Sequence, residues 1–268
     1  MAPRPRTPRG APAPLRAVAV ALAAAAAVLE RSGAVDVVPA TAAGVRHAPT
    51  PGRESAGAPL GRPQALAARS GSWAVEATGR DGEPARWDPC RPVHYVVNPS
   101  GMPPGGEEVL AAAVERVERA TGLRFVFDGT TDERERGTSY DVRRWGDRWA
   151  PALLRWDLSP EGTDGSGPGA DVLGRGGPVV ARTSSGRAVV VSGTAGLTTS
   201  ATRGFEDPGV RRRAEAVWLH ELGHLVGLAH VEDPGQVVNA AFAGVLDHGA
   251  GDLTGLAALG TGPCLDEV

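Results

Sequence analysis

The chain has 268 residues, a formal net charge of −3 and 41% hydrophobic residues, which suffices for one sizeable domain with extensions. All 28 basic residues are arginine, and only 4% of the residues are aromatic, so a single modest core is the most that this composition supports. The balanced charge argues against a nucleic-acid-binding protein, and Arg211, Arg212 and Arg213 are interpreted as a solvated surface.

The N-terminus has the pattern of an export signal. Several arginines up to Arg16 precede an uninterrupted apolar run from Ala17 to Leu29, and this run is too short for an ordinary membrane span. We therefore predict a signal peptide over residues 1–40, with small-residue cleavage sites near 38–40 or 40–42; an uncleaved N-terminal anchor is the alternative. Both place the protein outside the cytoplasm, secreted or tethered to the outer face of the membrane, and an anchor would be its only membrane contact.

Residues 41–72 are rich in Ala, Gly, Pro and Arg and contain few large apolar side chains, which predicts a disordered linker. The main domain is then expected over residues 73–268. Cys90 and Cys264 stand near the start and the end of this domain. In an exported protein such an even pair predicts a disulfide.

Within the domain, apolar periodicity and turn residues predict alternating strands and helices. A predicted hairpin turns at residues 183–186, and a predicted helix starts at Asp207-Pro208, an N-cap residue followed by proline. The expected strands are 93–97, 123–127, 152–156, 174–180 and 187–192, and the expected helices are 105–121, the one starting at 207–208, and 252–259.

The most informative stretch is 220–230, which reads HELGHLVGLAH and fits the pattern H-E-x-x-H-x-x-G-x-x-H. On a helix, His220 and His224 share one face and can bind one ion. Gly227 can end the helix and turn the chain, which brings His230 round as a third ligand. Three histidines leave one zinc position open, as in a catalytic site, and Glu221 is placed to act as general base toward the zinc-activated water.

This motif and the order of elements resemble the metzincin metallopeptidases, and within them the matrixin group in a compact bacterial version. The resemblance implies an α+β fold in which a twisted mixed β-sheet covers the active-site helix and a small C-terminal subdomain closes the cleft. It also implies a catalytic Zn²⁺ on His220, His224 and His230, with Glu221 catalytic. By the same analogy, the strand at 187–192 would be the sheet edge that binds an extended peptide.

The sequence departs from the family pattern at one position and leaves several questions open. Val238 stands where metzincins carry a methionine beneath the zinc, so weaker metal binding is expected there. Calcium, which matrixins carry, has no ligand loop that the spacing of Asp157, Asp164 and Asp171 supports. Some metzincins are kept latent by a cysteine on the zinc, which is the alternative to the disulfide for Cys90.

The predicted function is therefore a secreted or tethered zinc-dependent endopeptidase, acting on a protein or peptide substrate and expected as a monomer. The alternative is a zinc-containing protein that binds a peptide or a surface polymer without cutting it. A third reading is a closed structural zinc site, which needs a fourth ligand such as His248 or a free Cys90.

Overall fold

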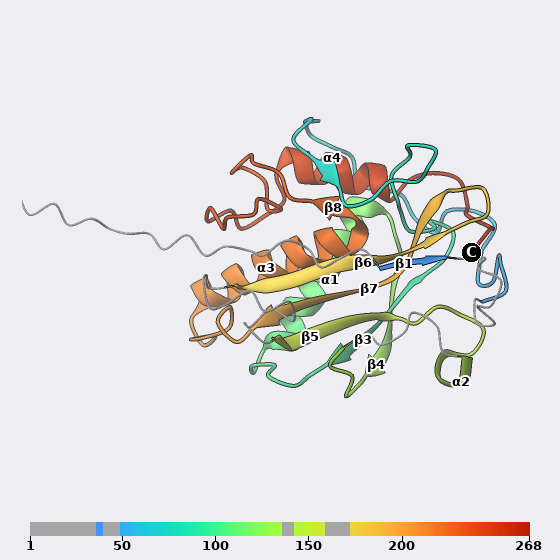
Figure 1. Ribbon diagram of the computed structural model, residues 1–268. Coiled ribbons are helices and arrows are strands. Elements are labelled where there is room, and N and C mark those ends of the chain that lie inside the picture. The colour runs from blue at the N-terminus through green and yellow to red at the C-terminus, as the bar shows by residue number, and fades with distance from the viewer. Residues whose placement is uncertain (1–35, 40–48, 136–141, 159–171) are drawn as a thin grey trace, which may run out of the picture.

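The structure is a computed structural model that describes residues 36–39, 49–135, 142–158 and 172–268 (Figure 1). Its main element is a six-stranded mixed sheet with the strand order β1-β6-β7-β5-β3-β4. The strands are β1 (Asp36–Pro39), β3 (Val93–Asn98), β4 (Phe125–Thr130), β5 (Ala152–Leu158), β6 (Gly174–Arg182) and β7 (Ala188–Thr198).

Strand direction separates one side of the sheet from the other. Neighbouring strands run parallel from β4 through β3 and β5 to β7, whereas β6 returns antiparallel to β7 through a tight turn. Strand β1 is added to the outer side of β6 in parallel and covers only its second half, Val179–Arg182. The predicted α+β character with a mixed sheet is thus confirmed.

The predicted position of one strand within the sheet was wrong. The predicted edge strand at 187–192 belongs to β7, which pairs with β6 on one side and with β5 on the other. Its residues are almost all buried, as expected of a strand covered on both faces. The antiparallel strand β6, not β7, is therefore the one that lies toward the outside of the sheet.

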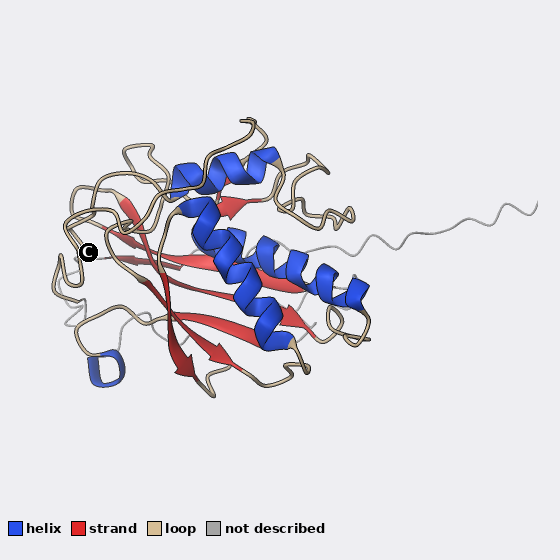
Figure 2. Ribbon diagram, turned by 180° about the vertical axis from the view of Figure 1, so that it is seen from behind, coloured by secondary structure: helices blue, strands red, loops and turns tan. Residues whose placement is uncertain are grey.

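Helices cover one face of this sheet, as the view from behind shows (Figure 2). Helices α1 (Gly106–Thr121) and α3 (Pro208–Val226) pack against each other, and α3 also contacts β6 and β7. The fully buried rings of Trp156 on β5 and Trp218 on α3 meet edge to face at 5.2 Å, which joins helix and sheet in the core. Helix α4 (Ala250–Leu259) contacts α1 and α3, and α2 (Val142–Trp145) is a single turn.

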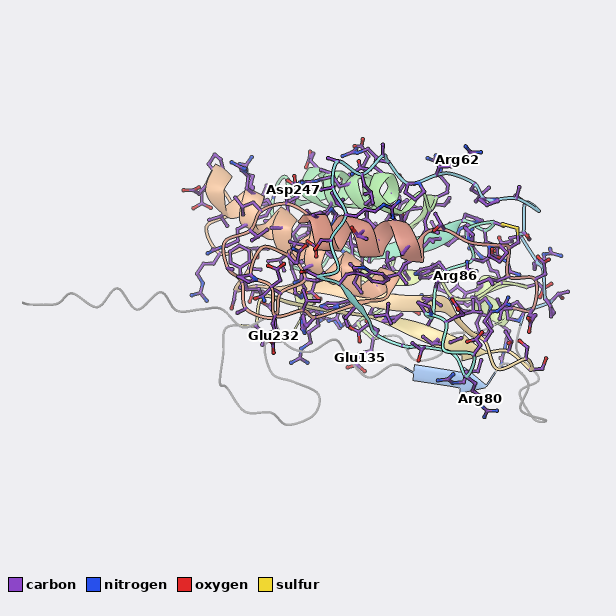
Figure 3. The ribbon with its side chains drawn as sticks, turned by 90° about the horizontal axis from the view of Figure 1, so that it is seen from above. Arg62, Arg80, Arg86, Glu135, Glu232 and Asp247 are labelled. Atoms are coloured by element: carbon purple, nitrogen blue, oxygen red, sulfur yellow. A yellow bond between two sulfur atoms is a disulfide. The ribbon has the colours of Figure 1, made fainter. Side chains whose placement is uncertain are left out.

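The opposite face of the sheet carries a smaller apolar cluster. Val179, Val189 and Val191 lie there against Leu265 and Val268 from the C-terminal segment. That segment is covalently attached to the start of the domain, because Cys90 and Cys264 form a disulfide with an S–S distance of 2.01 Å (Figure 3). The predicted disulfide is present, and Cys90 is therefore not a free thiol that could occupy a metal position.

The segment between β1 and β2 lies along the domain. Residues 49–72 contain no helix or strand, but Leu60 donates its backbone N–H to Pro89 and Gln64 donates to Arg119. Close to its end, the N–H of Ser70 is bonded to Thr254 on α4. The described part of the predicted linker is thus held against the domain by backbone hydrogen bonds.

Two short strands connect this segment to the end of helix α3. β2 (Ala74–Val75) pairs antiparallel with β8 (Leu228–Ala229), which follows α3 directly. Apart from β1, the predicted leader with its apolar run lies outside the described residues. Within the described part of the chain, no helix is both long and apolar enough to cross a bilayer.

Candidate metal centre

Helix α3 carries the first half of the site, and its ends form as the sequence predicts. Asp207 is the N-cap, accepting a hydrogen bond at 2.6 Å from the N–H of Gly209, and Pro208 follows at the first helical position. The helix ends at Gly227, whose φ of 120° is a backbone conformation that favours glycine. The chain reverses there and continues into β8, which leads to His230.

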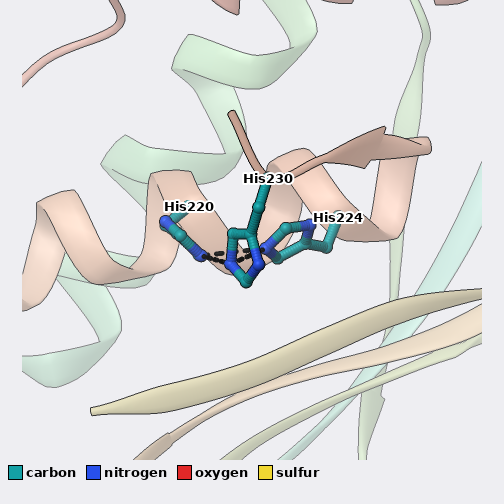
Figure 4. A group of neighbouring side chains, drawn as sticks. All are labelled: His220, His224 and His230. Atoms are coloured by element: carbon teal, nitrogen blue, oxygen red, sulfur yellow. Dashed lines mark hydrogen bonds between the residues drawn. The ribbon is translucent and has the colours of Figure 1, made fainter. Parts of the chain in front are cut away.

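The three histidines of the motif come together at the end of this turn (Figure 4). The Nε2 atom of His220 lies 2.8 Å from that of His224 and 3.0 Å from that of His230. The Nε2 atoms of His224 and His230 are 3.1 Å apart. The predicted ligands are thus brought to one point, although His230 stands outside the helix.

Hydrogen bonds at the far side of two rings fix their tautomers. Nδ1 of His220 lies 2.6 Å from the carbonyl oxygen of Val237, and Nδ1 of His224 lies 2.7 Å from that of Leu228. Because a carbonyl oxygen only accepts, each Nδ1 carries the proton, and in the neutral ring Nε2 presents a lone pair. Burial, reinforced by the neighbouring His224, lowers the pKa of His220 well below its ordinary value, so this ring stays neutral.

Such convergence of lone pairs is repulsive unless a cation lies between them. Zinc–nitrogen bonds of about 2.0–2.1 Å place tetrahedral ligands about 3.3 Å apart, so these three nitrogens need to separate by only a few tenths of an ångström to hold zinc. His220 and His224 have the outer hydrogen bond that orients metal-bound histidines. The residues therefore fit a three-histidine zinc site.

Glu221 lies next to this cluster in an unusual environment for a carboxylate. It is only 1% exposed, and neither of its oxygens has a hydrogen-bond partner among the described residues. Burial raises the pKa of Glu221 well above its usual range, and the charge of Arg175 opposes this effect. A buried carboxylate that protein groups leave unbonded is what a proton-accepting residue requires.

Two glycines of β6 leave space for Glu221, a role that was not predicted from the sequence. A Cβ atom on Gly174 would lie 2.6 Å from Oε1 of Glu221, and one on Gly176 would lie 2.4 Å from its backbone oxygen. Both distances are shorter than real Cβ contacts, so only glycine allows β6 to pass this close to α3. The closely spaced glycines at 174, 176 and 177 were the signal that could have indicated this approach.

The turn below the histidines is fixed by a buried carboxylate from α4. Asp252 is 0% exposed and accepts the backbone N–H of Val237 at 2.6 Å. The oxygen of the same Val237 is the partner of His220, so α4 supports this predicted metal ligand through the backbone of one residue. Val238, which stands where the metzincins carry a methionine, is fully buried and belongs to the main core.

Nothing closes the site with a fourth protein ligand in the described part of the chain. The group of possible metal-ligating side chains there contains His220, His224 and His230, and His248 is not among them. Cys90 is held in its disulfide. An open pocket adjoins the third ligand, and its lining is mostly apolar: His230, Val231, Glu232, Pro234, Asn239, Ala240, Ala241 and Ala243.

A second pocket lies elsewhere on the domain and has a different character. It is lined in part by Arg91, His94 and Arg148, and none of the three clustered histidines belongs to it. Its charged groups pair with nearby acids: Arg148 with Asp128 at 2.8 Å, and Arg91 with Asp88 at 3.2 Å. These ion pairs account for the charges of the pocket, and we assign no chemistry to it.

Of the three carboxylates considered as calcium ligands, the structure describes Asp157 alone. Asp164 and Asp171 lie outside the described residues, and Asp157 forms ion pairs with Arg134 and Arg155.

No protein-family model matches this chain, and a comparison with curated proteins finds no significant relative. The functional argument therefore rests on the histidine cluster and on Glu221.

Proposed function

We propose that the chain is a zinc-dependent endopeptidase of the metzincin type, matrixin-like in its sheet and helix arrangement, and that it acts outside the cytoplasm. One observation carries the proposal: three histidine Nε2 atoms within 3.1 Å of one another lie beside a buried Glu221 whose oxygens have no described partner. A structural zinc site has no use for that carboxylate. A catalytic site requires it.

The chemistry follows from the positions of these groups. Zinc, when bound by the three histidines, supplies Lewis acidity toward the carbonyl of the scissile peptide and toward water. Glu221 accepts a proton as the water oxygen bonds to the carbonyl carbon, and it then delivers this proton to the amine nitrogen as the C–N bond breaks. A raised pKa suits both halves of this transfer, because the carboxyl must hold the proton between them.

The sheet offers a place for an extended peptide. Strand β1 covers β6 only at Val179–Arg182, and no other described strand pairs with the outer side of Gly174–Pro178. This half of β6, which no other described strand covers, passes directly over Glu221. An extended substrate would add there as a further strand, with its backbone bonded to β6 and its side chains reaching the pocket beside His230.

The test combines metal analysis with a cleavage assay of the purified chain on a broad peptide library, with and without a chelator. We expect one zinc per chain and cleavage that the chelator abolishes. Glu221→Gln should keep its zinc and lose activity by about a hundredfold or more, since general acid–base catalysis contributes about 10²–10⁴-fold. The matched control is Glu206→Gln, which changes an exposed carboxylate just before the same helix.

Two outcomes would contradict the proposal. Cleavage by Glu221→Gln at the wild-type rate would remove Glu221 from the mechanism. Zinc binding by the wild type with no cleavage of any peptide would favour the alternative, a zinc-containing protein that binds a peptide or surface polymer without cutting it.

A further inference from the structure

A second carboxylate contacts the metal centre from a distant part of the sequence. Oε1 of Glu76 lies 3.1 Å from Nδ1 of His224, the ring nitrogen that faces away from the cluster. The side chain of His224 is 0% exposed and that of Glu76 only 12%, so water screens this contact weakly. Glu76 is about 150 residues upstream of the motif, and no spacing rule would have paired the two.

The backbone holds Glu76 in this place. Its N–H donates to the carbonyl of Gly227 at 2.9 Å, at the turn that ends α3. The residue before it, Val75, pairs with Leu228 in the β2–β8 ladder. The carbonyl of Leu228 is the hydrogen-bond acceptor of His224, so the ladder that positions Glu76 also positions the neutral partner of the same ring.

The two helical ligands therefore have different surroundings. The Nδ1 of His220 faces the carbonyl of Val237, which carries no net charge. The Nδ1 of His224 faces both a carbonyl and a carboxylate. A negative charge at this position increases the electron donation of the imidazole and favours a cation at its other nitrogen.

The charge balance of the proposed zinc site also favours a carboxylate at this position. Three neutral histidines bring no charge to a buried dication, and such an ion is strongly disfavoured without nearby compensation. Glu76 brings a carboxylate to the outer nitrogen of His224. Its negative charge would offset part of the charge of Zn²⁺ without adding a fourth protein ligand.

We infer that Glu76 is a positioning residue of the metal centre: its carboxylate orients His224 and raises the affinity for zinc without binding the ion. The inference rests on the proposed function, because it presumes that the three histidines bind zinc. It assigns a role to the segment 73–76, which precedes the sheet and would otherwise be regarded as the edge of the domain.

The test measures zinc affinity by competition with a chromophoric chelator, without any substrate. Glu76→Gln keeps the size of the side chain and removes its charge, and we expect it to weaken zinc binding by about 10–100-fold, the usual effect of losing such an outer partner. The matched control is Glu83→Gln, which removes an exposed carboxylate from the same part of the chain. The control should bind zinc as tightly as the wild type.

A purely structural role would give a different pattern. The unfolding midpoint of the zinc-free protein should be the same for Glu76→Gln and for the wild type, because the β2–β8 ladder does not depend on the charge. A lower midpoint with unchanged zinc affinity, or a zinc affinity within twofold of the wild type, would overturn the inference. If the wild type binds zinc but cleaves nothing, the proposed function fails while the affinity ratio still decides the role of Glu76. If the wild type binds no zinc, both fail.

Discussion

The close approach of β6 to Glu221 allows a sharp prediction for Gly174→Ala. The added methyl group would lie 2.6 Å from Oε1 of Glu221 and 2.8 Å from the backbone oxygen of Gly196, whereas ordinary contacts begin at 3.4 Å. An overlap of about 0.8 Å on one side and about 0.6 Å on the other cannot be relieved by the carboxylate alone, since the second contact is with backbone. The strand backbone must therefore move, with or without the carboxylate.

The magnitude follows from these overlaps. Overpacking of this kind costs about 1–3 kcal/mol of folding free energy. A catalytic group displaced by about 1 Å can lose about a hundredfold in rate. Zinc affinity should hardly change, because no histidine of the cluster is among the nearest contacts of the added methyl group.

Three measurements on the same preparation separate these effects: urea unfolding, chelator competition for zinc, and peptide cleavage. Gly71→Ala serves as the control, because a Cβ at Gly71 has no neighbour within 4 Å. We expect Gly174→Ala to retain zinc, to be destabilised and to cleave about a hundredfold more slowly. A variant as stable and as active as the wild type would refute the reasoning that glycine is required beneath Glu221.

Further predictions concern the floor of the site, a buried histidine and the disulfide. Val238→Met should destabilise the fold by about 1–3 kcal/mol in urea unfolding and give no gain in zinc affinity. The reason is that Val238 is fully buried and that its Cγ1 would lie only 3.1 Å from a Cβ on Gly223. A variant more stable than the wild type would show that there is unfilled space around this side chain. Burial lowers the pKa of His248 from 6.5 to about 4, so the unfolded chain takes up this proton first and stability falls as the pH drops from 6.5 to 4. At about 1.4 kcal/mol per pKa unit, the loss of folding free energy is about 3 kcal/mol. The zinc-free His248→Gln variant should not show this loss. If its stability depends on pH as that of the wild type does, His248 does not contribute. Replacing Cys90 and Cys264 together by serine opens a loop with a sequence separation of 174. The chain-entropy model then predicts a loss of about 5 kcal/mol of folding free energy, measured by denaturant unfolding. A loss below about 1 kcal/mol would contradict this prediction.

The parts of this structure that sequence predicts well are those determined locally. The start of α3 follows from Asp207-Pro208 and its end from Gly227, because capping and the conformational freedom of glycine act within a few residues. His220 and His224 share a face for the same local reason. The convergence of His230 could be predicted only because the motif fixes the length of the turn that leads to it.

The sequence pattern did not predict how segments that are distant in the chain are placed relative to one another. The 187–192 strand has the apolar pattern of any buried strand, and only the pairing of β7 with both β5 and β6 shows that it is not the edge. Strands β2 and β8 have two residues each, too few to produce a periodic signal. The segment at 49–72 is poor in apolar side chains, yet backbone hydrogen bonds, which composition does not report, hold it on the domain.

The metal site itself combines both kinds of information. One helix supplies two of the proposed ligands and the proposed base through local spacing, whereas the turn at Val237 and the carboxylate of Asp252 orient His220 from another part of the chain. An intact motif in an unfolded chain would therefore present ligands without the orientation that tight binding needs. If the proposed site binds zinc, its affinity will therefore depend on the tertiary structure around α3. A substitution that loosens α4 or the β2–β8 ladder should weaken metal binding even where every histidine is retained.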